Sequence, residues 1–134
     1  MSLIVDSSVW IDGFNPKAKN REKDALKKLI QDDYPVFLCP IIYQEVLQGI
    51  REDSTYEKVK NVLRQFRMIN IDLMLVTERA IELYRYLRKK GVAIRKSVDC
   101  LIASYAIITN FPILHNDSDF SLIAKESKLK IYKV

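Results

Sequence analysis

Four acidic residues stand in settings that would let their carboxylates share one site. Asp6 and Asp117 each follow a short run of β-branched or aliphatic residues, a pattern that predicts a buried strand. Glu45 and Asp99 each fall in the first turns of a predicted amphipathic helix. Hard divalent cations prefer carboxylate oxygens, so we interpret the four acids as one divalent-metal site.

The layout of an α/β chain explains how such distant residues would meet. A residue just past a parallel strand lies at the carboxyl edge of the sheet, where open sheets bind their ligands. A helix that runs antiparallel to the strands begins at that same edge. The pattern therefore predicts an α/β fold with a central, mostly parallel sheet and the acids gathered along its carboxyl edge.

Hydrophobic periodicity and turn residues predict the elements of this fold. The expected strands are Leu3–Val5, Val36–Leu38, Met68–Ile71, Ile113–His115 and Leu129–Tyr132. The expected helices are 20–31, one that opens at Pro40, 56–66, one from a Thr77 cap to Gly91, and one that opens at Ser97. Turns are expected at Asp12–Pro16 and Asn116–Phe120.

The helix that carries Asp99 is expected to be the most buried, because residues 100–106 are nearly all apolar. We expect the positive helix end and the backbone amides to keep Asp99 ionised, as a metal ligand requires. Four clustered acids without a metal would also repel one another and raise some of their pKa values. Taken alone, Asp99 is better explained as a plain amino-terminal cap, and the other acids as turn, cap or surface residues.

Length and charge narrow the class of protein. A chain of 134 residues with 49% hydrophobic content suffices for one core and not for two, so we expect a single domain over residues 1–134. Twenty-two Lys and Arg against 17 Asp and Glu give a net charge of +5. Basic surface around an acidic pocket suits a polyanion bound by its phosphates, although ordinary solubility charge also explains the balance.

Cysteine usage and hydropathy predict the compartment. Cys39 and Cys100 form no CxxC pair, which argues against a zinc knuckle or a disulfide framework. No apolar run approaches a membrane span, and the first strand begins too early for a signal peptide. We expect a soluble, cytoplasmic protein.

Four motifs occur in a fixed order along essentially the whole chain: Ile4–Ile11 (IVDSSVWI), Gln44–Gly49 (QEVLQG), Ser97–Ala103 (SVDCLIA) and His115–Phe120 (HNDSDF). This order of strand-Asp, helix-Glu, helix-Asp and strand-Asp resembles the PIN-domain ribonucleases, most closely the VapC-type toxins of type II toxin–antitoxin pairs. The resemblance implies a three-layer α/β/α fold and a metal-dependent endoribonuclease that cleaves RNA. It also implies a homodimer and neutralisation by a cognate antitoxin protein.

The resemblance further implies roles for single residues. Asp6, Glu45 and Asp99 match the three central acids of the family. Asp117 matches the fourth, with Asp119 beside it as a substitute or water-mediated ligand, and the choice between these two stays open. Ser7 matches a hydroxyl position near the metal.

Ligand chemistry supports Mg²⁺ or Mn²⁺, because an all-acid site without a histidine pair disfavours zinc. Such an ion activates a water for in-line attack on phosphorus and stabilises the departing ribose oxygen. One ion, or two ions about 3.5–4 Å apart, would suit four carboxylates. His115 is the only histidine, which excludes the two-imidazole mechanism of metal-free ribonucleases.

Substrate contacts are expected from Arg95 and Lys96, which immediately precede the Asp99 helix, and from Ser7 and the Asn116 amide. The Arg85–Lys90 cluster is either a more distant RNA-binding strip or a solvated helix face. Three rival functions remain. They are a housekeeping RNA-processing nuclease of the same fold, a non-catalytic RNA-binding module, and a haloacid-dehalogenase-type phosphotransferase, which would need an acid where Ser8 stands.

Overall fold

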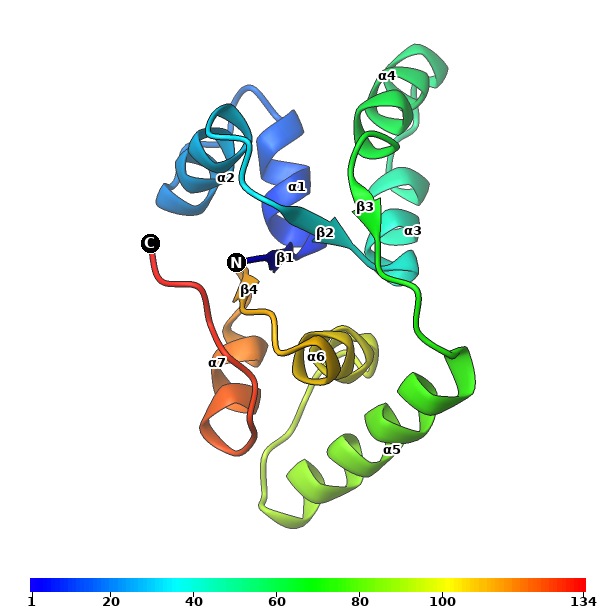
Figure 1. The fold of residues 1–134 in the computed structure, drawn as a ribbon, viewed down its shortest axis with the longest axis vertical. Coiled ribbons are helices and arrows are strands. Elements are labelled where there is room, and N and C mark those ends of the chain that lie inside the picture. Colours follow the sequence, from blue (N-terminus) through cyan, green and yellow to red (C-terminus); the bar gives the residue numbers. More distant parts are fainter.

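The sheet has four short strands, all parallel. The structure is a computed structural model that describes residues 1–134. Its strands are β1 (Leu3–Val5), β2 (Val36–Leu38), β3 (Arg67–Met68) and β4 (Ile113–Leu114). They lie in the order β3-β2-β1-β4 (Figure 1). The chain therefore moves outward from β1 to β3 and then crosses back to place β4 on the other side of β1.

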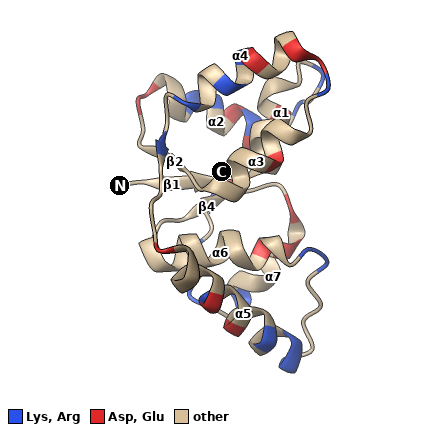
Figure 2. Ribbon diagram, turned by 90° about the vertical axis from the view of Figure 1, so that its right-hand side faces the viewer, with Lys and Arg blue, Asp and Glu red and all other residues tan.

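Seven helices cover the sheet: α1 (Ser7–Phe14), α2 (Arg21–Gln31), α3 (Pro40–Gln48), α4 (Asp53–Leu63), α5 (Leu73–Lys89), α6 (Val98–Thr109) and α7 (Ser118–Lys125). Figure 2 shows α1 to α4 on one side of the sheet and α5 to α7 on the other. The predicted three-layer α/β/α architecture with a parallel sheet is confirmed. No helix has the length and apolar character needed to cross a membrane.

Strands β1, β2 and β4 are short, continuous apolar runs, whereas both residues of β3 are exposed. Leu3, Ile4 and Val5 of β1 are fully buried, because helices cover both faces of the sheet. Helix α6 is the most buried helix, as predicted, with seven of its twelve residues buried. One cluster of 30 buried residues extends from Leu3 to Leu129 and joins the two helical layers through the sheet.

Two helices lie where the sequence was expected to form turns. Helix α1 begins directly after Asp6 and includes Asp12 to Phe14 of the predicted turn, with Val9 and Trp10 packed in the core. Helix α7 begins at Ser118 inside the second predicted turn. In both cases an Asp accepts a hydrogen bond from a backbone N–H of the first turn, so these residues start helices.

Other boundaries also differ from the prediction. Asp72, not Thr77, caps α5, because Asp72 Oδ2 accepts from Leu75 N at 3.0 Å while Thr77 Oγ1 donates to Leu73 O within the helix. The expected strand at Leu129–Tyr132 is reduced to a single parallel bridge between Ile131 and Ile113. Helix α4 begins and ends three residues before the predicted bounds, and β3 has two residues. Tertiary packing decides these ends, which local sequence signals mark poorly.

Candidate metal centre

Asp6 lies where β1 meets its neighbour β4. Its backbone N–H donates to Leu114 O at 2.9 Å, which continues the ladder past the last strand residue. Its side chain caps α1, since Oδ2 accepts from Ser8 N at 3.1 Å and from Ser8 Oγ at 2.7 Å. The carboxylate is almost fully buried. Strand order reverses between β1 and β4, so Asp6 occupies the switch point where open α/β sheets bind ligands.

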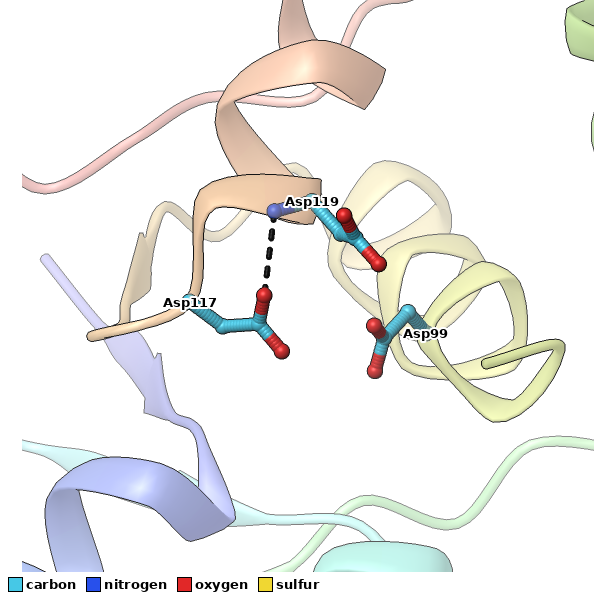
Figure 3. A group of neighbouring side chains, drawn as sticks. All are labelled: Asp99, Asp117 and Asp119. Carbon is cyan, nitrogen blue, oxygen red and sulfur yellow. Dashed lines mark hydrogen bonds between the residues drawn. The ribbon is translucent and has the colours of Figure 1, made fainter. Parts of the chain in front are cut away.

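Asp117 and Asp119 follow β4 at the start of α7. Asp117 is the N-cap residue, and its Oδ1 accepts from Asp119 N at 3.0 Å, the dashed line in Figure 3. Asp119 lies in the first turn and is buried, with 3% of its surface exposed. The Asp-Ser-Asp sequence thus brings two carboxylates close together, and both lie in the same group of acids.

Asp99 completes a compact group of three acids. Each of Asp99, Asp117 and Asp119 offers a carboxylate oxygen, and these oxygens lie within 4.8 Å of one another. Figure 3 shows the Asp99 side chain reaching from α6 toward the other two. Asp99 is 2% exposed, and its Oδ2 has no hydrogen-bond partner. A buried carboxylate oxygen without a partner is costly, so this atom is a candidate ligand for a cation.

Burial raises the pKa of Asp99 from 3.8 to about 7. That value also includes smaller upward contributions from the charges of Asp117, Asp6 and Asp119, and it includes the opposing charge of Lys96, which lowers the pKa. The expectation that the helix end keeps Asp99 ionised is therefore wrong for the metal-free chain, because burial and three neighbouring acids dominate one helix terminus. The expected mutual repulsion of the acids is confirmed.

Two cations from the segment before α6 contact these acids. Arg95 Nη2 lies 3.3 Å from Asp117 Oδ1, and Arg95 Nε lies 3.5 Å from Asp119 Oδ2. Lys96 Nζ lies 3.2 Å from Asp117 Oδ2. Burial alone would raise the pKa of Asp117, but the Asp119 N–H, Lys96 and Arg95 together bring it below its usual value. These contacts therefore favour the ionised form of Asp117.

Glu45 lies outside the group of three acids. It is the sixth residue of α3 and so belongs to the second turn, and Ser7 Oγ donates to its Oε1 at 3.0 Å. Burial, with smaller contributions from the charges of Asp6 and Glu45, raises the pKa of the Cys39 thiol to about 12. Asp6 and Glu45 thus lie near a common neighbour, yet neither belongs to the group of three acids.

Three residues that the sequence did not assign to the site support it. Ser8 Oγ accepts from Asn116 N at 3.1 Å, and Asp12 Oδ2 accepts from Asn116 Nδ2 at 3.2 Å, which turns the Asn116 amide toward α1. His115 Nδ1 accepts from Asp117 N at 3.1 Å. Burial lowers the pKa of His115, which favours the neutral imidazole that this bond needs, although Asp6 and Asp117 oppose the shift. The Asp-Ser-Ser capping sequence was the available signal for Ser8.

The donor set fits a hard divalent cation. The group offers only carboxylate oxygens, two of its three acids are buried, and one oxygen lacks any partner. A parallel α/β sheet with such a group at its switch point defines a class of three-layer proteins with a candidate divalent-metal site.

Comparison with known proteins gives the family. The family model of the PIN domain matches residues 3–126, so the chain belongs to the PIN domain family. Ribonuclease VapC1 of Methanocaldococcus jannaschii is 31% identical over 131 residues, which cover 97% of this chain and 86% of that protein. Ribonuclease VapC11 of Mycobacterium tuberculosis is 27% identical over 128 residues, 96% of each chain. The predicted resemblance to PIN-domain proteins of the VapC type is confirmed.

Solved structures agree on the fold. VapBC2 from Rickettsia felis, bound to a DNA fragment from their promoter, superposes with a TM-score of 0.77 at 18% identity. The match covers 98% of each chain. At that identity the likeness supports the three-layer fold over the whole chain.

Proposed function

We propose that this protein is a divalent-metal-dependent endoribonuclease and the toxin of a toxin–antitoxin pair. The observation that carries the proposal is the Asp99 carboxylate, which is grouped with two further carboxylates and has a buried oxygen, Oδ2, without a partner. The names of the VapC ribonucleases support the substrate class. The four-acid site of Asp6, Glu45, Asp99 and Asp117 remains our assignment, with Asp119 as a fifth acid.

Each side chain has a role in this proposal. Asp99, Asp117 and Asp119 would hold Mg²⁺ or Mn²⁺, and Asp6 would contribute from the end of β1. The bound ion would act as a Lewis acid on the phosphate and supply a nucleophile from water at neutral pH. Glu45, held by Ser7, would orient water at the rim of the site. Asn116 is directed at Asp12, so a substrate contact would require its amide to turn.

His115 has a positioning role in this scheme. Its Nδ1 is already used by the Asp117 N–H, and the ring packs against Phe120 with centroids 5.4 Å apart. This arrangement fixes the start of α7 and so the two carboxylates on it. No proton transfer needs to be assigned to the single histidine.

The proposal includes two kinds of protein partner. The solved relatives include a toxin–antitoxin complex from Klebsiella pneumoniae, which supports a cognate antitoxin for this chain. Exposed apolar side chains along α5, Met74 and Ile81, support a homodimer. The two unpaired, buried cysteines suit a reducing compartment, so we propose that the protein acts in the cytoplasm.

A cleavage assay tests the enzymatic part. Purified protein is incubated with a mixed, structured RNA pool and Mg²⁺ or Mn²⁺, with EDTA as the metal-free control. Asp99→Asn and Asp119→Asn should each lower the rate at least about 100-fold, because each removes a charged ligand of the cation. Glu57→Gln, which removes an exposed acid on α4, should leave the rate unchanged. Cleavage that survives in EDTA or in both site variants would refute the assignment.

A growth assay separates a toxin from a housekeeping nuclease of the same fold. Induced expression of the wild-type protein should arrest growth, and the Asp99→Asn variant should not. Co-expression of a small gene adjacent in the genome should restore growth. Normal growth with an active enzyme would favour the housekeeping role.

A further inference from the structure

The cations of the α5–α6 connection hold the acids that the proposed metal would need. Both oxygens of Asp117 contact a cation, Oδ1 from Arg95 and Oδ2 from Lys96. Asp119 Oδ2 contacts the Arg95 side chain at 3.5 Å and its backbone N–H at 3.2 Å. An ammonium or guanidinium group that contacts these oxygens occupies the lone pairs that would bind a divalent cation.

The two sides of these ion pairs differ in how firmly they are placed. The carboxylates are nearly buried, with side chains 10% exposed in Asp117 and 4% in Asp119. The cationic side chains are 71% exposed in Arg95 and 54% in Lys96. Ion pairs with such exposed cations are weak, and long side chains can turn into solvent at little cost. The acids therefore stay in place while their cations can leave.

We propose that Arg95 and Lys96 are exchangeable counter-ions that alternate between the acidic group and the phosphates of bound RNA. Without a divalent cation they neutralise Asp117 and Asp119. When the cation binds, its charge repels them, and they turn outward to the RNA backbone. The Arg95 N–H bond to Asp119 keeps the segment anchored, so the side chains swing from a fixed point. This inference rests on the proposed metal-dependent nuclease.

The exchange couples two binding events. A divalent cation must displace Lys96 and Arg95 to bind, and RNA gives these side chains a new anionic partner. RNA should therefore tighten metal binding, and the metal should tighten RNA binding by the same factor, because coupling between two ligands is reciprocal. In the absence of RNA, such a site binds the metal weakly, and RNA binding raises its affinity for the metal.

Mn²⁺ titration by calorimetry tests the competition without any need for catalysis. Lys96→Gln should bind Mn²⁺ about three- to tenfold more tightly than the wild type, because the competing charge is gone. Lys27→Gln removes the same charge from the exposed face of α2, where Lys27 makes no ion pair, and should stay within about twofold of the wild type. Equal or weaker Mn²⁺ binding by Lys96→Gln would overturn the exchange.

A second titration tests the coupling. A hydrolysis-resistant 2′-O-methyl phosphorothioate oligoribonucleotide should tighten Mn²⁺ binding to the wild type by a similar factor. The effect should vanish in the double variant Arg95→Gln, Lys96→Gln and persist in Lys27→Gln. An unchanged effect in the double variant would overturn the role of these side chains. If the wild type binds no Mn²⁺ at all, the proposed metal site fails as well, which distinguishes that failure from a failure of the exchange alone.

Discussion

Replacing Asp99 by Asn should stabilise the metal-free protein while removing its activity. Asp99 is 2% exposed, its Oδ2 lacks a partner, and its neighbours Asp117 and Asp119 are both acidic. Asn has nearly the same shape, carries no charge, and offers two N–H donors to the surrounding carboxylates. The substitution therefore removes the electrostatic penalty without leaving a cavity.

The magnitude follows from the pKa of Asp99. Its value of about 7 in the folded chain lies above the ordinary 3.8, so between these pH values the folded chain keeps a proton that the unfolded chain has released. The corresponding stability is fully present below about pH 4 and is lost as the pH rises to about 7. The difference in pKa corresponds to at most about 4 kcal/mol. Relaxation around the charge lowers this, so we expect a gain of about 2 kcal/mol for Asp99→Asn above pH 7.

Thermal unfolding in EDTA between pH 4 and pH 8 measures this gain. For a chain of this length about 2 kcal/mol corresponds to a rise in Tm of about 6–10 °C, expected at pH 8 and absent at pH 4. Glu57→Gln, the exposed matched control, should show no pH-dependent difference from the wild type. If Asp99→Asn is no more stable than the wild type at pH 8, the buried, unpaired carboxylate is not the source of strain that we infer.

Two further substitutions test local contacts. Ser7→Ala removes the 3.0 Å hydrogen bond from Ser7 to Glu45. It should lower the cleavage rate about tenfold and the free energy of unfolding by about 1 kcal/mol. An unchanged rate would mean that Glu45 has no role in cleavage. Gly91 has φ +77° and open space around its Cβ position, so Gly91→Ala should cost about 1 kcal/mol through the backbone alone and leave the rate per folded molecule unchanged. Thermal unfolding and the cleavage assay together check both.

Local patterns in the sequence were sufficient to predict the framework of the site. The apolar runs of β1 and β2 predict strands buried on both faces, and the apolar helix after Asp99 predicts the most buried helix. Parallel topology then places residues that follow β1 and β4 at one edge. These inferences depend only on hydrophobic periodicity and on the general layout of α/β folds. Both can be read from one sequence, and the structure confirms the inferred elements.

The details that failed depend on contacts between distant segments or on competing local signals. Gly13 and the Asn15-Pro16 pair mark the end of α1, and their turn signal concealed the helix that precedes them. Asp117 is the N-cap and Asp119 a first-turn residue of the short helix α7. The Asn-Asp-Ser-Asp sequence is typical of a turn, so the helix was not predicted. Arg95 lies 22 and 24 residues from these acids. No periodicity in one sequence reports such a pairing, because packing of α6 against α7 creates it.

The position of Asp99 explains why the group of acids lowers the stability of the metal-free protein. Helix α6 lies in the middle of one helical layer and contacts both α5 and α7, so a charge in its first turn is isolated from water. A sequence selected only for stability would place a neutral residue there. Arg95 and Lys96 relieve Asp117 and Asp119 but leave Asp99 Oδ2 without a partner. A divalent cation would neutralise all three acids at once. Asp99 therefore lowers the stability of the metal-free protein, and for the same reason metal binding would raise the stability of the folded state.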